Sequence, residues 1–160
     1  MSFIIGIDPG ANGAVAILDN KTGDLVQVFD MPSVEITIGG KNKKRVAPYL
    51  LAEELRLYNV HGTRAIVENV SAMPGQGVTS MFAFGHAFGL ALGVLAGMGI
   101  TADLVTPAKW KRDLKVNPGK DGSRLLAMTL WPDKAGEFKR VKDDGRAEAA
   151  LLAHWLRSIP

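Results

Sequence analysis

The sequence predicts a single α/β domain over residues 1–160, built on a mixed five-stranded sheet flanked by helices. Short apolar runs at 3–8, 63–68 and 102–105 are typical of buried strands. Further strands bounded by turns follow the first run, and stretches with helical periodicity separate the later runs. A chain of 160 residues is also long enough to bury one core.

The first part of the chain is predicted to be mostly strand. Phe3–Asp8 is apolar until its last residue and indicates a central strand, followed by a turn at Pro9–Gly13. A second strand is expected from Ala14 to Leu18, and Asn20–Asp24 closes a hairpin into a third strand at Leu25–Phe29. These three strands are therefore expected to be antiparallel.

A smaller hairpin and the first helix come next. The segment 34–46 alternates like a second hairpin, with Gly39 and Gly40 at its tip. Pro48 stands where a helix can begin, and a helical pattern of apolar residues runs from Tyr49 to Leu57.

The second part of the chain is predicted to be mostly helical. Residues 72–77 indicate a loop that precedes a helix at 79–98. The strand at 102–105 is then followed by three more expected helices, at 107–114, 121–130 and 144–158.

The stretch from Met81 to Ile100 is almost uncharged and about as long as a membrane span. However, Gly85, Gly89, Gly93 and Gly97 recur at every fourth position, which costs helix stability unless close packing requires it. No basic flank marks a cytoplasmic side, and the rest of the chain has a soluble α/β pattern. We therefore expect no membrane span but a buried helix with a groove for close approach, at a dimer interface.

Composition restricts the chemistry. The chain has no cysteine, which removes disulfides, thiolate metal sites and cysteine nucleophiles. No signal peptide is recognised at the N-terminus, so we expect a cytoplasmic protein of a bacterial or phage-infected cell. The three histidines have no ligand spacing, and the motifs GxGxxG, GxxxxGK[ST] and GxSxG are absent. We expect no small-molecule cofactor.

Two predicted strands end in a carboxylate, Asp8 and Glu68. If the strands are neighbours, these like charges meet, which is unfavourable unless a cation is bound. In the last helix, Asp144 and Glu148 are spaced i,i+4 and share a face with the apolar Leu151. That face packs inward, so its acids point at the strand ends.

Four carboxylates without histidine or cysteine suit a hard cation such as Mg²⁺. The reaction that they suit is phosphodiester hydrolysis with two metal ions, of which one activates water and the other stabilises the leaving oxygen. Asp143, next to Asp144, competes for the same role, and either of the two could instead cap the last helix.

Basic residues form two clusters. The first comprises Lys41, Lys43, Lys44 and Arg45, and the second comprises Lys109, Lys111, Arg112, Lys115, Lys120 and Arg124. With 19 basic and 16 acidic residues the chain is only mildly basic, so these clusters are either solvated surface or phosphate contacts. Their place beside a carboxylate site favours phosphate contacts.

Five motifs in order resemble those of phage-type RuvC Holliday junction resolvases, which have the RNase H-like fold. They are Gly6–Gly10, Val67–Val70 with Met73–Gly77, Phe82–Gly85, Val105–Pro107 with Trp110–Lys111, and Asp144–Ala149. The match extends from residue 4 to about residue 156. An actin-like or sugar-kinase ATPase begins with a similar strand but needs two such domains.

The resemblance implies a homodimeric nuclease that nicks opposed strands of four-way or other branched DNA. It makes Asp8, Glu68, Asp144 and Glu148 the ligands of two Mg²⁺ ions, with Mn²⁺ as a substitute. It also assigns DNA contacts to basic residues, and with the first cluster the predicted DNA-binding set is Lys109, Lys111, Lys120, Arg124, Lys43, Lys44 and Arg45.

This chain differs from bacterial members in three ways. The last acid is Glu148 rather than Asp, and it follows Asp144 by four residues rather than three. Ser71 also stands where bacterial members carry an aromatic, so a residue that stacks at the junction centre is expected elsewhere, at Met73 or Phe82. Two alternatives stay open: a nuclease acting on flaps, forks or RNA–DNA hybrids, and a junction-binding protein that has lost hydrolysis.

Overall fold

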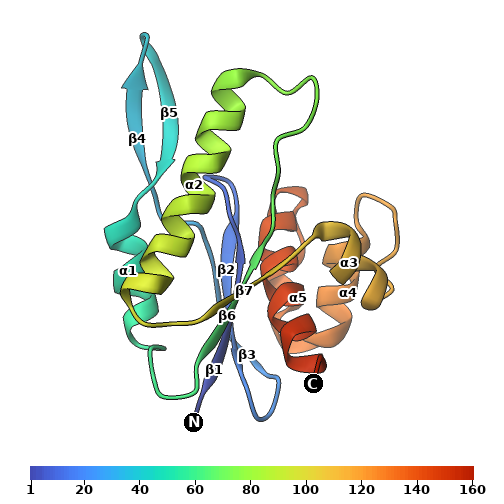
Figure 1. Ribbon diagram of the computed structural model, residues 1–160. Helices are drawn as coiled ribbons and strands as arrows, with labels where there is room; N and C mark the ends of the chain where they lie inside the picture. Colours follow the sequence, from blue (N-terminus) through green and yellow to red (C-terminus); the bar gives the residue numbers. More distant parts are fainter.

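The computed structural model describes residues 1–160 and is built on one five-stranded sheet (Figure 1). Its strands are β1 (Phe3–Asp8), β2 (Ala14–Asp19), β3 (Leu25–Asp30), β6 (Arg64–Glu68) and β7 (Ala102–Val105). They lie in the order β3-β2-β1-β6-β7, with β1–β2 and β2–β3 antiparallel and β1–β6 and β6–β7 parallel. The prediction of a mixed five-stranded sheet is therefore correct.

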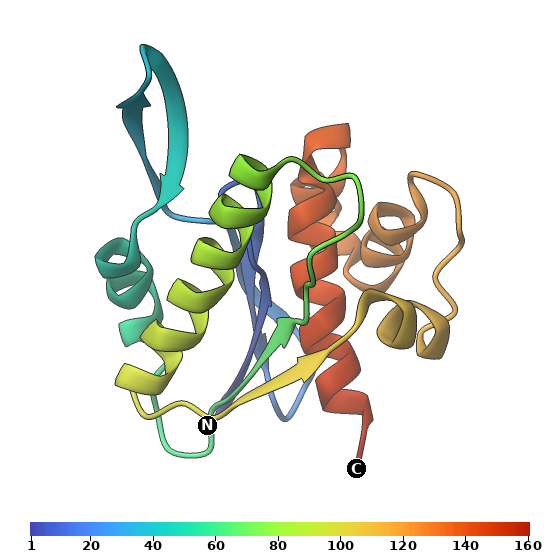
Figure 2. The ribbon, with the colours of Figure 1, turned by 45° about the horizontal axis from the view of Figure 1, so that its top comes forward.

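Five α-helices flank this sheet. They are α1 (Pro48–Arg56), α2 (Val78–Gly97), α3 (Pro107–Asp113), α4 (Gly122–Leu130) and α5 (Asp144–Ser158). Figure 2 shows α1 and α2 on one face of the sheet and α5, backed by α3 and α4, on the other. Short 3₁₀ segments at Pro132–Phe138 and Val141–Asp143 join α4 to α5, and neither segment was predicted.

The sheet separates two hydrophobic clusters. Alternate residues of β1 contribute to each: Ile4 faces α5, while Ile5 and Ile7 face α1 and α2. Because side chains of a strand alternate between faces, a strand covered on both sides is apolar throughout. This explains why β1 lacks the alternating pattern of a half-exposed strand.

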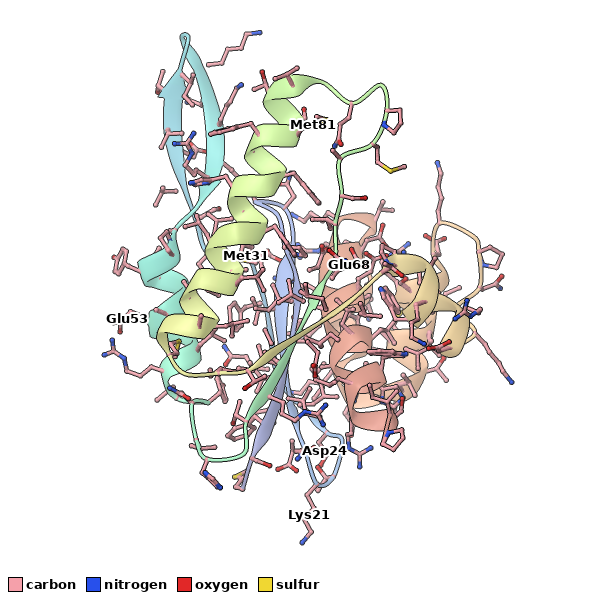
Figure 3. The ribbon with its side chains drawn as sticks, in the orientation of Figure 1. Lys21, Asp24, Met31, Glu53, Glu68 and Met81 are labelled. Carbon is pink, nitrogen blue, oxygen red and sulfur yellow. The ribbon has the colours of Figure 1, made fainter.

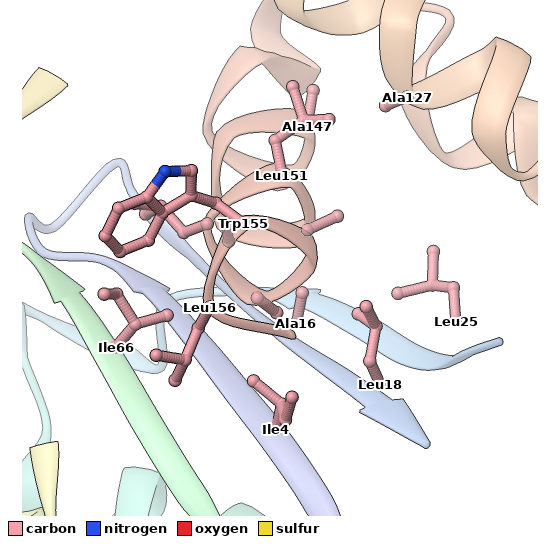
Figure 4. Packing of buried hydrophobic residues seen from close by; sticks show 14 of the residues in the cluster. Ile4, Ala16, Leu18, Leu25, Ile66, Ala127, Ala147, Leu151, Trp155 and Leu156 are labelled. Carbon is pink, nitrogen blue, oxygen red and sulfur yellow. The ribbon is translucent and has the colours of Figure 1, made fainter. Parts of the chain in front are cut away.

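Helix α5 lies against the sheet at backbone distance. A Cβ atom on Gly6 of β1 would lie 2.0 Å from the carbonyl oxygen of Ala149 and 2.8 Å from the amide nitrogen of Ala153. Figure 4 shows the larger residues Leu151, Trp155 and Leu156 of α5 among the strand residues of this cluster. Glycine on the strand and alanine on the helix therefore fix where α5 begins relative to the end of β1.

The predicted second hairpin is present as β4 (Ser33–Ile38) and β5 (Lys41–Val46), which form a separate two-stranded sheet. Gly39 and Gly40 connect the strands with positive φ values of 60° and 74°, as a tight hairpin turn of the primed type requires. The hairpin projects beyond the main sheet beside α2 (Figure 1), and most of its residues are exposed.

Helix α2, predicted to be buried with a groove at a dimer interface, is only partly buried within a single chain. Only Ala87, Ala91 and Leu95 are buried, because α2 covers the sheet with one side and leaves the other uncovered. The exposed side is apolar too, so no polar stripe marks it in the sequence. By length and composition alone, α2 is long and apolar enough to cross a membrane. In this structure, 17% of its most apolar 18-residue window is buried inside the protein.

The two chain ends lie close to one end of the molecule in both views (Figures 1 and 2). Strand β1 runs away from this end and finishes at Asp8, and α5 returns towards it from Asp144. The carboxylates at the end of β1 and the start of α5 therefore lie at the opposite end.

Candidate active site

Three predicted acids converge at the carboxyl ends of two neighbouring strands. Asp8 ends β1, Glu68 ends the parallel strand β6, and Glu148 projects from the second turn of α5. One carboxylate oxygen from each lies within 4.8 Å of the other two. Glu68 is labelled in Figure 3, where β6 ends beside α5 and α3.

Glu68 is buried and oriented by a tryptophan. The indole Nε1 of the fully buried Trp110 donates a hydrogen bond of 2.9 Å to Oε1 of Glu68. Burial raises the pKa of Glu68, the bond from Trp110 opposes that rise, and the nearby charge of Glu148 adds to it. The second oxygen of Glu68 remains available for another partner.

Asp8 has the most strongly shifted pKa of the three. Burial, followed by the negative charges of Glu68 and Glu148, raises the pKa of Asp8 to about 8. Such a cluster of carboxylates is unstable in its fully charged form without a cation. Three converging oxygen ligands and a repulsion that a cation would relieve both fit a divalent metal ion.

A lysine already lies among these acids. Nζ of Lys111 is 2.5 Å from Oε1 of Glu148, and Oγ of Ser123 lies 3.5 Å from the same oxygen. Lys111 also lowers the pKa of Asp8 and of Glu68, in each case less than burial raises it. The centre therefore attracts positive charge from the protein itself.

The acids open into a pocket of about 740 Å³, here called the acid pocket. Asp8, Asp144 and Glu148 line one side, and residues 111–123 of α3, α4 and their connecting loop line the other. The basic residues on its wall are Lys111, Arg112, Lys115, Lys120 and Lys142. Carboxylates at the bottom are suited to a cation, and the lysines around them are suited to the phosphate oxygens of a phosphodiester.

No protein-family model matches the chain. Its sequence is 31% identical over 155 aligned positions to the chloroplastic Holliday junction resolvase MOC1 of Chlamydomonas reinhardtii. That alignment covers 81% of this chain and 17% of the algal protein, so this chain spans a small part of its relative's length.

Two structures of RuvC from Thermus thermophilus are similar in fold. One, solved in complex with Holliday junction substrate, aligns with a TM-score of 0.62 and 15% identity over 96% of this chain and 91% of that chain. The other aligns with a TM-score of 0.56 and 17% identity, over 97% and 95% of the two chains. This chain has the RuvC fold. The RNase H-like architecture expected from the five motifs is thereby confirmed.

Within the RuvC fold of this chain, Asp144 lines the acid pocket but stands apart from the three converging acids. Its Oδ1 accepts a 3.0 Å hydrogen bond from Nε of Arg124, and 47% of its side chain is exposed. Its second oxygen has no partner within the chain and remains available for a cation. Its role as a ligand stays a prediction.

Asp143 has a different role from Asp144. It is only 1% exposed and accepts hydrogen bonds from the backbone and the guanidinium of Arg140, which closes the 3₁₀ turn before α5. Burial opposes its charge, but the bonds from Arg140 outweigh it and lower the pKa of Asp143. Because Arg140 occupies both its oxygens, Asp143 is structural, and Asp144 is the better of the two candidates for the metal.

Arg124, predicted to contact DNA, is buried and bonded within the protein instead of lying free at the surface. Its side chain is 8% exposed, and its guanidinium donates to Asp144, to Asp121 and to the carbonyl oxygens of Phe138 and Lys139. Arg124 thus joins α4 to the start of α5, with four of its five N–H donors engaged inside the protein.

The other predicted DNA-binding residues divide into three groups. Lys111 and Lys120 line the acid pocket, as a contact to the cut strand would require. Lys109 lies outside that lining, where it pairs with Asp113 and covers the ring of Trp155. Lys43, Lys44 and Arg45 are exposed on β5 of the projecting hairpin.

Three features of the site have no role in the sequence-based prediction. Trp110 is part of a quoted motif, but its bond to Glu68 joins residues 42 positions apart and has no local signal. Asn12 lines the acid pocket from the turn after β1. Lys142 lines the pocket from the unpredicted 3₁₀ turn.

Proposed function

We propose that this protein is a Holliday junction resolvase, a metal-dependent endodeoxyribonuclease that nicks opposed strands of four-way DNA junctions in recombination, repair or phage genome processing. The observation that carries the proposal is the convergence of Asp8, Glu68 and Glu148, of which Asp8 and Glu148 line a lysine-rich pocket. The similarity to a chloroplastic Holliday junction resolvase and the RuvC fold support it.

The metal is proposed to be Mg²⁺, with two ions per site and Mn²⁺ as a substitute. The ligands would be the carboxylates of Asp8, Glu68 and Glu148, with Asp144 as the fourth. Carboxylate oxygens without nitrogen or sulfur ligands favour a hard ion. When bound there, divalent ions supply activation of a water nucleophile and stabilisation of the leaving 3′ oxygen.

The protein's own groups prepare this site. Trp110 holds one oxygen of Glu68, which leaves the other directed at the centre. With its pKa near 8, Asp8 carries a proton at neutral pH that it must release when a cation is bound. Lys111 must then leave Glu148, and together with Lys120 it is placed to hold oxygens of the phosphodiester being cut.

The dimer is proposed to form through the uncovered side of α2. Gly85, Gly89 and Gly93 are exposed there, and a Cβ atom on any of them would meet nothing within 4 Å. Helices whose contact positions are small approach each other closely. An apolar, glycine-rich helix face of this length is therefore suited to a second copy of the chain, which would give two acid pockets for two opposed nicks.

The test is cleavage of an end-labelled synthetic four-way junction with Mg²⁺, beside a linear duplex of the same sequence, a flap and an RNA–DNA hybrid. The proposal expects paired symmetric nicks in the junction and an intact duplex. Asp8→Asn should abolish the nicks but keep junction binding within about threefold, because phosphate contacts carry most of the affinity.

Other results identify the alternatives. Cleavage of the flap or hybrid in preference to the junction would indicate a different branched substrate. Tight junction binding without any metal-dependent nick would indicate a protein that binds but does not cut. Full activity of Asp8→Asn would contradict the assignment of the acids.

A cytoplasmic location in a bacterial or phage-infected cell also stays a prediction.

A further inference from the structure

Arg124 is the one basic residue of the chain that is buried. Its guanidinium bonds to three separate segments, because its acceptors are Asp121 before α4, the carbonyl oxygens of Phe138 and Lys139, and Asp144 at the start of α5. A buried charge is stable only when such partners surround it. The guanidinium is therefore fixed in place from several sides.

The carboxylate of Asp144 is held by much less. Its side chain is 47% exposed, and the bond of 3.0 Å from Nε of Arg124 is the only hydrogen bond that it accepts. Asp144 lies in the first turn of α5, but no side chain caps that helix, so this carboxylate does not serve the free N–H groups there. Arg124 alone determines where the carboxylate points.

The other acid of α5 has a different kind of partner. Glu148 is paired with Lys111, whose side chain is 38% exposed, whereas that of Arg124 is 8% exposed. A lysine on a flexible four-carbon stem can move away when a cation arrives. Arg124 cannot follow, because its other acceptors retain it. The pocket thus combines one exchangeable cationic partner with one permanent partner.

The permanent partner occupies only one oxygen of its acid. Nε of Arg124 donates to Oδ1 of Asp144, and Asp144 lines the acid pocket. Trp110 treats Glu68 in the same way, since it donates to Oε1 and leaves the second oxygen free. Groups that bond one atom of a metal ligand orient its other atom.

We infer that Arg124 is a positioning residue for the metal site: it holds Asp144 by one oxygen so that the other faces the cation. The inference rests on the proposed nuclease function and deepens it, because it assigns a role to a buried arginine that touches neither metal nor DNA. Its effect on the cation passes through Asp144 alone.

The first experiment replaces Arg124 with lysine. Lysine keeps the positive charge, and with it the repulsion of a cation, but loses the planar fork that fixes the carboxylate. Titration of DNA-free Arg124→Lys protein with Mg²⁺ in a calorimeter should give an affinity about tenfold below that of the wild type, as for other partners of metal ligands. The Mg²⁺ concentration for half-maximal junction cleavage should rise by the same factor.

A double-mutant cycle tests whether this effect passes through Asp144. In an Asp144→Asn background, adding Arg124→Lys should change Mg²⁺ affinity by less than about twofold, because the oriented carboxylate is already absent. A tenfold loss in both backgrounds would overturn the inference, since Arg124 would then act on the fold and not on Asp144.

Arg140→Lys is the matched control. Arg140 also bonds a carboxylate through its fork just before α5, but that carboxylate belongs to Asp143, which is structural. Both lysine variants should unfold at a lower urea concentration than the wild type, and only Arg124→Lys should lose Mg²⁺ affinity. Equal losses of Mg²⁺ affinity would overturn the inference.

A milder variant serves if Arg124→Lys does not fold. Asp121 bonds the same guanidinium, but its side chain is 59% exposed and caps no helix. Asp121→Asn therefore loosens Arg124 without emptying a buried site. It should lower Mg²⁺ affinity about threefold, a smaller loss than for Arg124 itself, and again only while Asp144 is present. Unchanged affinity in this variant would overturn the inference.

Junction binding separates positioning from a phosphate contact. In a chelating buffer and the Asp8→Asn background, Arg124→Lys should bind the junction as tightly as its parent. Lysine cannot reproduce the two parallel bonds of a guanidinium to phosphate, so weaker binding would mean that Arg124 contacts DNA and would overturn the inference.

The two proposals fail in different ways. If the wild-type protein neither binds Mg²⁺ nor cuts any junction, the proposed function fails and the inference fails with it. If the wild type does both and Arg124→Lys does both equally well, only the inference about Arg124 is overturned.

Discussion

The indole N–H groups of the three tryptophans fix three different parts of the molecule. Trp110 donates to Glu68, Trp155 donates to Asp113 at the end of α3, and Trp131 donates to the carbonyl oxygen of Gly23 in the β2–β3 turn. A buried indole needs such an acceptor. Only the first of these bonds reaches one of the three converging acids, so the tryptophans allow a positioning role to be separated from a structural one.

Replacing Trp110 with phenylalanine should raise the Mg²⁺ concentration needed for half-maximal cleavage about tenfold. A hydrogen bond to a charged group is worth about 1.5–3 kcal/mol, and without it Glu68 is free to turn. Trp131→Phe is the matched control: it also loses an indole bond and buried volume, but it should leave the metal requirement unchanged. Equal shifts in both variants would mean that Trp110 acts through stability alone.

Asp8 should make the metal-free protein less stable as the pH rises. Its pKa of about 8 in the fold exceeds the ordinary value of 3.8, so between these values the folded carboxyl holds a proton that the unfolded one has lost. The contribution of this proton to stability is complete below pH 4 and is lost as the pH rises through 8.

Asp8→Asn removes this dependence. In a chelating buffer, its melting temperature should exceed that of the wild type by more at pH 9 than at pH 5, with roughly 2–4 °C expected for each kcal/mol relieved. Added Mg²⁺ should raise the melting temperature of the wild type but not of the variant. A constant difference between the two proteins at all pH values would contradict the raised pKa.

At the scale of the elements, the two long helices cover the sheet in different ways. Helix α5 contacts β1 through Gly6, Ala149 and Ala153, with no space for a methyl group on the strand. Helix α2 rests on Ala87, Ala91 and Leu95 and leaves its glycines uncovered. Glycine therefore has a structural purpose within the chain at β1, whereas at α2 the single chain gives it none and the proposed dimer would supply one.

Gly89→Leu should break the dimer without harming the chain. A side chain at Gly89 meets no atom of its own chain within 4 Å, and leucine is the better helix former by somewhat less than 1 kcal/mol. Light scattering of the variant should therefore give the mass of one chain. The urea concentration at which the variant unfolds should be no lower than that of the wild type. Gly136→Leu, at another exposed glycine with open space, should leave the mass unchanged. A dimer that survives Gly89→Leu would exclude this face as the interface.

At the scale of the whole molecule, exposed basic groups gather at the end that carries the acids. The lysines of the acid pocket and those of the hairpin lie on either side of Asn12, and one hollow connects them. With a formal net charge of only +3, affinity for DNA depends on this arrangement rather than on the total.

Lys120→Ala should reduce the slope of log K against log[salt] for junction binding by about 0.9, the value for one lost phosphate contact. Lys120 is exposed on the wall of the acid pocket and forms no ion pair that would be lost with it. Lys21→Ala, at the other end of the molecule, should leave the slope unchanged. If both variants behave alike, the acid pocket does not hold the backbone.

The sequence predicted the elements well because each has a local cause. Hydrophobic runs located β1 and β6, and paired glycines located the hairpin tip, all within a residue or two of their positions. The convergence of Asp8 and Glu68 was expected on the condition that their strands are neighbours, and that of Glu148 from the inward face of the last helix. These predictions needed no knowledge of distant contacts.

What the sequence left open depended on features without a local signal. Arg124 was expected to face DNA, but Asp144 and two carbonyl groups beyond α4 hold it inside. The choice between Asp143 and Asp144 depends on a 3₁₀ turn that no periodicity indicates. Helix α2 was expected to be buried because its exposed side is as apolar as its packed side.

The position of the chain ends affects how the protein can be extended. Both ends lie at the end of the molecule opposite the end of β1 and the start of α5, which carry Asp8 and Asp144 (Figures 1 and 2). A fluorescent label, a surface tether or a whole additional domain attached at either end would therefore leave the basic face open to DNA. Since one relative is several times longer than this chain, the same geometry would allow a core of this kind to carry appended domains without obstructing its own substrate.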